Sequence, residues 1–118
     1  MTRACWVLLA LIHVLPGAAF LRPALITSLY GVAPSSDAFV LLQHRAALFL
    51  VVAVVCVSAA LQPETRRLGA IVVALSMLSF LLLFAIGGMP ASLRLIATVD
   101  ALGLLPLSFV AWRAFSKS

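Results

Sequence analysis

Five polar side chains that could bind a ligand or exchange protons lie inside long apolar stretches of this sequence. They are His13, His44, Arg45, Ser79 and Asp100. Ionisable groups inside a membrane are costly to bury and are candidates for functional sites. Arg45 could hold an anionic or carbonyl oxygen, Asp100 could orient Arg45 or accept a proton, and the histidines could exchange protons near neutral pH. We predict that these five residues bind a ligand.

The composition of the chain identifies the solvent around these residues. Its 118 residues are 65% hydrophobic and 9% charged, and the formal net charge is +5. An average globular domain is about 45–50% apolar and about 25% charged, so we predict a chain embedded in a bilayer without a separate soluble catalytic domain. The basic residues are scattered singly between apolar runs, which argues against nucleic-acid binding.

Four apolar stretches are long enough to cross a membrane as helices of about 20 residues. They cover residues 5–21, 39–61, 68–86 and 95–112. A shorter apolar stretch, 24–30, cannot cross and either lies along the interface or folds back over the bundle. The sequence therefore predicts an all-α, integral membrane four-helix bundle of up-and-down topology, formed by one transmembrane domain over residues 1–118.

The first stretch has an alternative interpretation. Arg3, the apolar run and the small residues at 17–19 resemble a secretory signal peptide with its cleavage site. His13 and Pro16 interrupt the apolar run. We therefore predict that this stretch is a helix of the mature bundle.

The distribution of Lys and Arg favours one orientation in the membrane. If the N-terminus is cytoplasmic, the basic residues inside are Arg3, Arg66, Arg67, Arg113 and Lys117. Those outside are Arg22, Arg45 and Arg94. Because cytoplasmic loops carry the excess of basic residues, we predict that both termini are cytoplasmic. Trp6 and Trp112 would then lie at the same membrane interface, as in an aromatic belt.

This orientation gives each polar side chain a depth. His13 lies eight residues before Leu21, and Ser79 lies seven before Ile86. Arg45 lies eight residues after Asp37, and Asp100 lies eight after Ser92, counted from the residues that can cap these helices. With a rise of about 1.5 Å per residue, these positions are about 10–12 Å deep, and His44 is one step shallower than Arg45. Four helices thus bring a polar group to one layer, where we expect the side chains to point inward and Arg45 to pair with Asp100.

Two interpretations of this layer remain open. In the first, a buried ion pair between Arg45 and Asp100 only sets the register of two helices, and the histidines are packing residues. In the second, the layer lines a pocket that binds or transports a small or lipid-like molecule. As partners we expect membrane lipids and such a ligand, and the chain could also form a homo-oligomer or serve as a structural or accessory subunit of a larger membrane complex.

Other chemistry finds little support in the sequence. Two histidines and one acid on separate helices fall below the usual ligand set of zinc, and Cys5 and Cys56 lie in apolar stretches without metal-ligand spacing. Phosphate-binding glycine loops and hydrolase motifs are absent from the sequence. We expect no metal and no cofactor, and an enzyme that acts on a membrane-embedded substrate is the least favoured alternative.

Five segments together carry a resemblance to a known family. They are HVLPG at 13–17, LYGV at 29–32, QHRAALF at 43–49, LSMLSF at 75–80 and LRLIATVD at 93–100. Over nearly its whole length the chain resembles a family of small, uncharacterised four-helix bacterial membrane proteins, often labelled phosphopantetheine adenylyltransferase, and its architecture is more loosely similar to DoxX-like proteins. The resemblance implies a multi-pass protein of the bacterial cytoplasmic (inner) membrane. It does not imply the labelled activity, because the soluble enzyme of that name is an α/β nucleotidyltransferase whose nucleotide-binding histidine motif this chain lacks.

Overall fold

The computed structural model describes residues 1–89 and 91–116, without the side chain of Ser92. All regular secondary structure in these residues is helical: α1 (Thr2–Leu21), α2 (Ala24–Tyr30), α3 (Asp37–Leu61), η1 (Pro63–Thr65), α4 (Arg66–Ile86), η2 (Ala91–Leu93) and α5 (Arg94–Ser116). In this part of the chain, α1, α3, α4 and α5 are long and apolar enough to cross a membrane. The predictions of an all-α fold and of four apolar spans are confirmed, and each predicted stretch falls within one of these helices.

Local sequence explains where several helices begin and end. Ser36 caps α3, because its Oγ accepts a hydrogen bond from the backbone N–H of Ala38 at 3.2 Å, and Asp37 follows in the first turn. Gly31 ends α2 with a φ of 67°, a left-handed conformation that glycine adopts without a clash of a Cβ atom. The tight turn between α3 and α4 begins at Gln62 and continues through η1.

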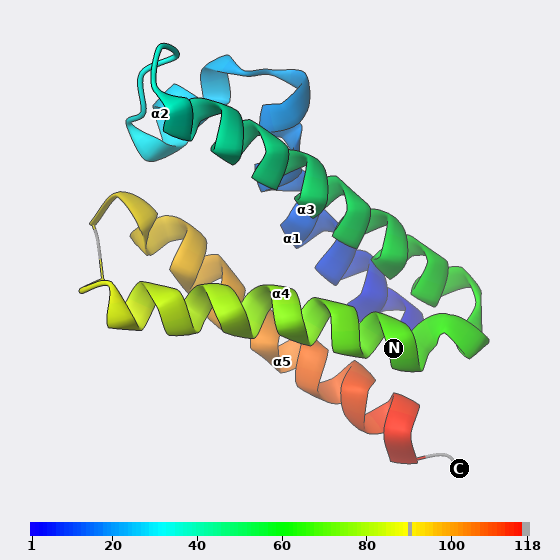
Figure 1. Cartoon of the computed structure of the whole chain (residues 1–118). Coiled ribbons are helices and arrows are strands. Elements are labelled where there is room, and N and C mark those ends of the chain that lie inside the picture. The colour runs from blue at the N-terminus through cyan, green and yellow to red at the C-terminus, as the bar shows by residue number, and fades with distance from the viewer. Residues whose placement is uncertain (90, 117–118) are drawn as a thin grey trace.

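The long helices pack as two pairs. The most extensive contact joins α1 to α3, and the next joins α4 to α5, while α1 also packs along α5 and α3 along α4 (Figure 1). The core between them contains the large side chain of Trp6 and small or medium side chains from all four helices: Leu9, Ala10, Val52, Cys56, Ala59, Ala60, Ala70, Val73, Met77, Leu107 and Val110. Small residues allow close helix packing where the surrounding lipid is as apolar as the core.

Trp6 points into the bundle, whereas Trp112 points outward. Trp6 is fully buried in the core and its Nε1 has no partner among the described residues, and Trp112 is exposed. Gly69 makes the burial of Trp6 possible, because a Cβ at that position would lie 3.1 Å from Trp6 Cη2. The indole therefore packs against α4 inside the bundle. The predicted position of Trp6 and Trp112 at one membrane interface stays a prediction.

The short helix α2 folds back over one end of the bundle. Its Ile26 is fully buried and packs with Ala19 of α1 and Ala46 of α3 in a second, smaller core. It also contacts η2, the turn before α5. Of the two alternatives for residues 24–30, the structure supports folding back over the bundle.

The opposite end of the molecule gathers the start of α1, the α3–α4 turn and the end of α5 (Figure 1). Arg3 Nε donates to the carbonyl oxygen of Ala60 at 3.2 Å, and Arg67 Nε donates to that of Ala114 at 3.0 Å. We call this the arginine end and the other the α2 end. The start of α1 and the end of α5 thus lie at the same end of the molecule (Figure 1).

Candidate functional site

Arg45 lies on the α3 face that looks toward α2 and α4, inside a cage of aromatic rings. Its Nη1 donates a hydrogen bond to the Tyr30 hydroxyl at 3.1 Å. The guanidinium carbon lies 4.7 Å from the centroid of Phe49, 5.0 Å from that of Phe80 and 5.8 Å from that of Tyr30. Rings at these distances stabilise a cation through their quadrupoles. The Arg45 charge is therefore held by α2, α3 and α4 together.

The expected ion pair between Arg45 and Asp100 is not formed. Within the described residues, Asp100 has no hydrogen bond and no ion pair, although Arg45 is close enough to act on it electrostatically. The physical reason is the packing order, because α3 contacts α1 and α4 extensively but not α5. Equal spacing from the helix ends predicted one layer for the two charges, but neighbouring helices separate them.

His13 is buried between α1 and α3. Its Nδ1 lies 2.8 Å from the carbonyl oxygen of Leu9, so Nδ1 is the protonated nitrogen that donates there, and Nε2 carries the lone pair in the neutral ring. The ring centroid is 5.9 Å from that of Phe49, the same ring that contacts Arg45. Nε2 is buried without a partner among the described residues. It is an acceptor that a donor group could satisfy.

Asp100 lies at an apolar groove near the α2 end. The groove has a volume of about 340 Å³. Its walls come from α1, α2 and α5, and its lining residues are Ile12, Leu15, Pro16, Ala18, Leu25, Leu29, Leu95, Ile96, Val99 and Asp100. Among these described residues Asp100 alone is charged, and it is 6% exposed. The groove can therefore hold an apolar molecule and offer it one carboxylate.

His44 and Ser79 do not join this site. Both side chains are exposed on the outside of the bundle, so the expectation that they point inward is wrong. His44 lies on the face of α3 opposite to the buried Ala46, because successive helical residues turn by about 100°. Ser79 Oγ donates to the carbonyl oxygen of Ser76 at 3.2 Å, so its hydroxyl is satisfied within its own helix and needs no interior partner.

The aromatic cage was not predicted from the sequence. The sequence offered one indication of it: Phe49 follows Arg45 at the i+4 spacing, which places the two side chains on one helix face. Nothing local marks Phe80 or Tyr30 as partners, because they reach Arg45 from other helices. The groove was likewise unpredicted, since α2 forms one of its walls only by folding back.

Comparison of the chain with models of protein families, with curated proteins and with solved structures finds no match. The resemblance to the four-helix bacterial family therefore stays a prediction. No group of three or more His, Cys, Asp or Glu in the described residues is arranged to hold a metal ion. The geometry of the site carries the functional argument.

Proposed function

We propose that the protein binds a lipid-like molecule in the groove between α1, α2 and α5. The observation that carries this proposal is the lining of the groove, which consists of nine apolar residues and the carboxylate of Asp100. Ligand pockets commonly combine a largely apolar wall with a few placed polar groups, and their volumes begin at about 300 Å³. A single acyl chain or a similarly sized apolar molecule would suit the groove.

The carboxylate defines the polar part of the ligand. An Asp at the centre of a membrane helix costs roughly 2.5–3.5 kcal/mol on insertion scales, and Asp100 has no hydrogen-bond partner among the described residues that offsets this cost. A hydroxyl, amide or ammonium group on the ligand would donate a hydrogen bond to it. We infer a ligand that is apolar over most of its surface and carries one such donor.

We further infer that the groove opens in the outer half of a bacterial cytoplasmic membrane. The arginine end carries Arg3, Arg66, Arg67 and Arg113, whereas Arg22 and Arg94 lie near the α2 end. The positive-inside rule then makes the arginine end cytoplasmic, together with both termini. A ligand in the groove would be a component of the outer leaflet or a molecule that partitions into it.

Native mass spectrometry of the protein purified in mild detergent tests the proposal. We expect a retained apolar molecule in the wild type and its loss in Asp100→Asn, which removes the charge but keeps the shape. The matched control is Asp37→Asn, because Asp37 is exposed at the start of α3. Its variant should retain the molecule.

A second variant keeps the test decisive if Asp100→Asn folds poorly. Ala18 lines the groove, so Ala18→Leu fills part of its volume and should expel the molecule. Ala38→Leu is the control, because Ala38 is exposed outside the groove. Unchanged retention in Asp100→Asn and Ala18→Leu would refute the proposal. A folded wild type that retains no molecule would also refute it and would favour the structural or accessory subunit.

A further inference from the structure

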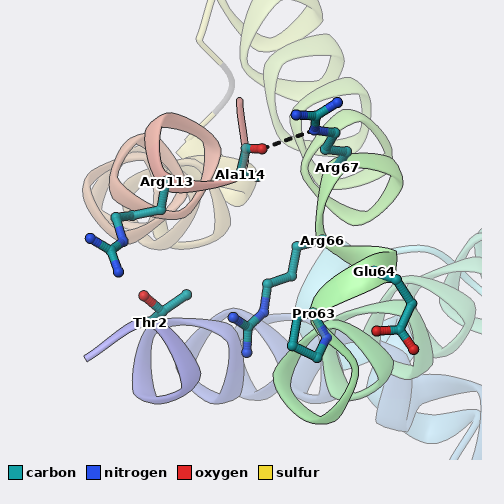
Figure 2. A pocket seen from close by; sticks show the side chains of 7 residues that line it. All are labelled: Thr2, Pro63, Glu64, Arg66, Arg67, Arg113 and Ala114. Atoms are coloured by element: carbon teal, nitrogen blue, oxygen red, sulfur yellow. Dashed lines mark hydrogen bonds between the residues drawn. The ribbon is translucent and has the colours of Figure 1, made fainter. Parts of the chain in front are cut away.

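A hollow at the arginine end gathers positive charge from segments far apart in the sequence. Its volume is about 270 Å³. The lining residues come from the start of α1, from η1 and α4, and from the end of α5, and they are Thr2, Pro63, Glu64, Arg66, Arg67, Arg113 and Ala114 (Figure 2). This hollow lies at the opposite end of the bundle from the groove and does not depend on it.

Backbone carbonyls hold the arginines of this end in place. Arg66 Nε donates to the carbonyl oxygen of Ala59 at 2.7 Å, and its Nη2 donates to that of Ala60 at 3.3 Å. Arg3 donates to the same oxygen of Ala60. These carbonyl groups lie in the last turn of α3, and the C-terminal end of a helix attracts cations. The guanidinium groups of Arg3 and Arg66 thereby share one carbonyl oxygen, which concentrates charge of one sign.

The described residues do not neutralise the charge of Arg113. The guanidinium of Arg113 makes no hydrogen bond or ion pair with any of them. In Figure 2 the Arg66 and Arg113 side chains extend toward Thr2 from either side, whereas the carboxylate of Glu64 points away from them. Three arginines and one turned-away acid therefore line the hollow. An anion placed between Arg66 and Arg113 would meet both cations.

We propose that the hollow bounded by Thr2, Arg66, Arg67 and Arg113 binds a phosphate group, carried by an anionic lipid head group or by a soluble phosphate compound. The planar guanidinium fork matches phosphate oxygens and can donate two parallel hydrogen bonds. The hydroxyl of Thr2 adds a further donor. The hollow lies at the ends of the membrane-spanning helices, which is the depth of lipid head groups.

The experiment measures binding of three probes to the purified protein in uncharged detergent by native mass spectrometry. The probes are dioctanoyl-phosphatidylglycerol, dioctanoylglycerol, which has the same chains without phosphate, and inorganic phosphate. We expect the phosphatidylglycerol to bind and Arg113→Gln to weaken it at least about tenfold, which corresponds to about 1.4 kcal/mol. Because Arg113 is exposed, this variant should fold as the wild type does.

Arg22→Gln is the matched control. Arg22 is also exposed, and its loss changes the net charge equally, but it lies at the α2 end. Equal weakening by both variants would refute the proposal, because general attraction to a basic protein would then explain the binding. Equal binding of dioctanoylglycerol and phosphatidylglycerol at an Arg113-dependent site would also refute it. Displacement of the lipid by inorganic phosphate supports a soluble phosphate compound as the ligand. If phosphate does not displace the lipid, the result supports the lipid head group.

Since the groove contains no arginine, dependence on Arg113 separates this site from the lipid-like ligand proposed above. A lipid whose binding is lost in Ala18→Leu but kept in Arg113→Gln occupies the groove. A lipid with the reverse pattern occupies the hollow. Failure of one proposal is therefore distinguishable from failure of the other.

Discussion

α1 and α3 approach each other closely at Gly17, one turn beyond His13 on the same face. A Cβ added at Gly17 would lie 2.7 Å from Leu50 Cδ2, 3.0 Å from Leu50 Cγ and 3.2 Å from the Leu50 backbone nitrogen. The Leu50 side chain can rotate, but its backbone nitrogen moves only with α3. Gly17→Ala should therefore push the two helices apart at the seam that places His13 beside Phe49.

The expected magnitude is a balance of two effects. Replacing Gly by Ala in a helix interior contributes about 1 kcal/mol of stability through propensity. Extra volume in a packed contact costs typically about 1–3 kcal/mol, and the backbone contact places Gly17→Ala toward the upper part of that range. We expect a net loss of about 1–2 kcal/mol in the free energy of unfolding.

Gly103→Ala is the matched control, because Gly103 is also a buried glycine of a long helix. Its added Cβ would lie 2.6 Å from Met77 Cε and 3.1 Å from Ile12 Cδ1, which are the ends of flexible side chains. We expect a change within about 0.5 kcal/mol of zero, since propensity offsets the rearrangement of Met77. Unfolding by titration with sodium dodecyl sulfate in mixed micelles measures both variants. Gly17→Ala as stable as Gly103→Ala would show that the seam is looser than the structure indicates.

Three further predictions concern the polar residues and the orientation. Tyr30→Phe keeps the ring over Arg45 but removes the hydrogen bond, so unfolding in mixed micelles should show a loss of about 0.5–1.5 kcal/mol. The same change should cost nothing further in an Arg45→Gln background, and an additive double variant would contradict the contact. His13→Ala should lower the free energy of unfolding by about 1–3 kcal/mol because the ring is buried, whereas His44→Ala should change it by less than about 0.5 kcal/mol. Equal effects of the two variants would contradict the burial of His13 and the exposure of His44. A reporter fused to the C-terminus should be active only in the cytoplasm, and periplasmic activity would reverse the proposed orientation.

Within the polar layer, the sequence correctly predicted the burial of two side chains but not the exposure of two others. His13 and Asp100 are buried as expected, whereas His44 and Ser79 are exposed. Depth follows from counting residues along a helix, because every helical residue adds the same rise. Direction does not, because the lipid and the core are both apolar and an apolar helix shows no strong contrast between its faces.

Arg45 illustrates the same limit for partners. Charge alone favoured Asp100, since an ion pair is the simplest compensation for two buried charges. The folded chain instead surrounds Arg45 with Tyr30, Phe49 and Phe80. Aromatic faces attract a guanidinium although they carry no formal charge. A search of the sequence for opposite charges therefore does not find them. Partner choice thus depended on which helices became neighbours.

The sequence by itself determined that this chain is helical, apolar along four stretches and basic mainly at one end of them. Hydropathy and charge are local properties, and each residue contributes to them wherever its helix packs. Only the tertiary structure decided that α2 closes one wall of a groove with Asp100, and that Thr2, Arg66 and Arg113 meet around one hollow. These sites join segments far apart in the chain, and the packing order of the helices, which no local pattern encodes, brings them together.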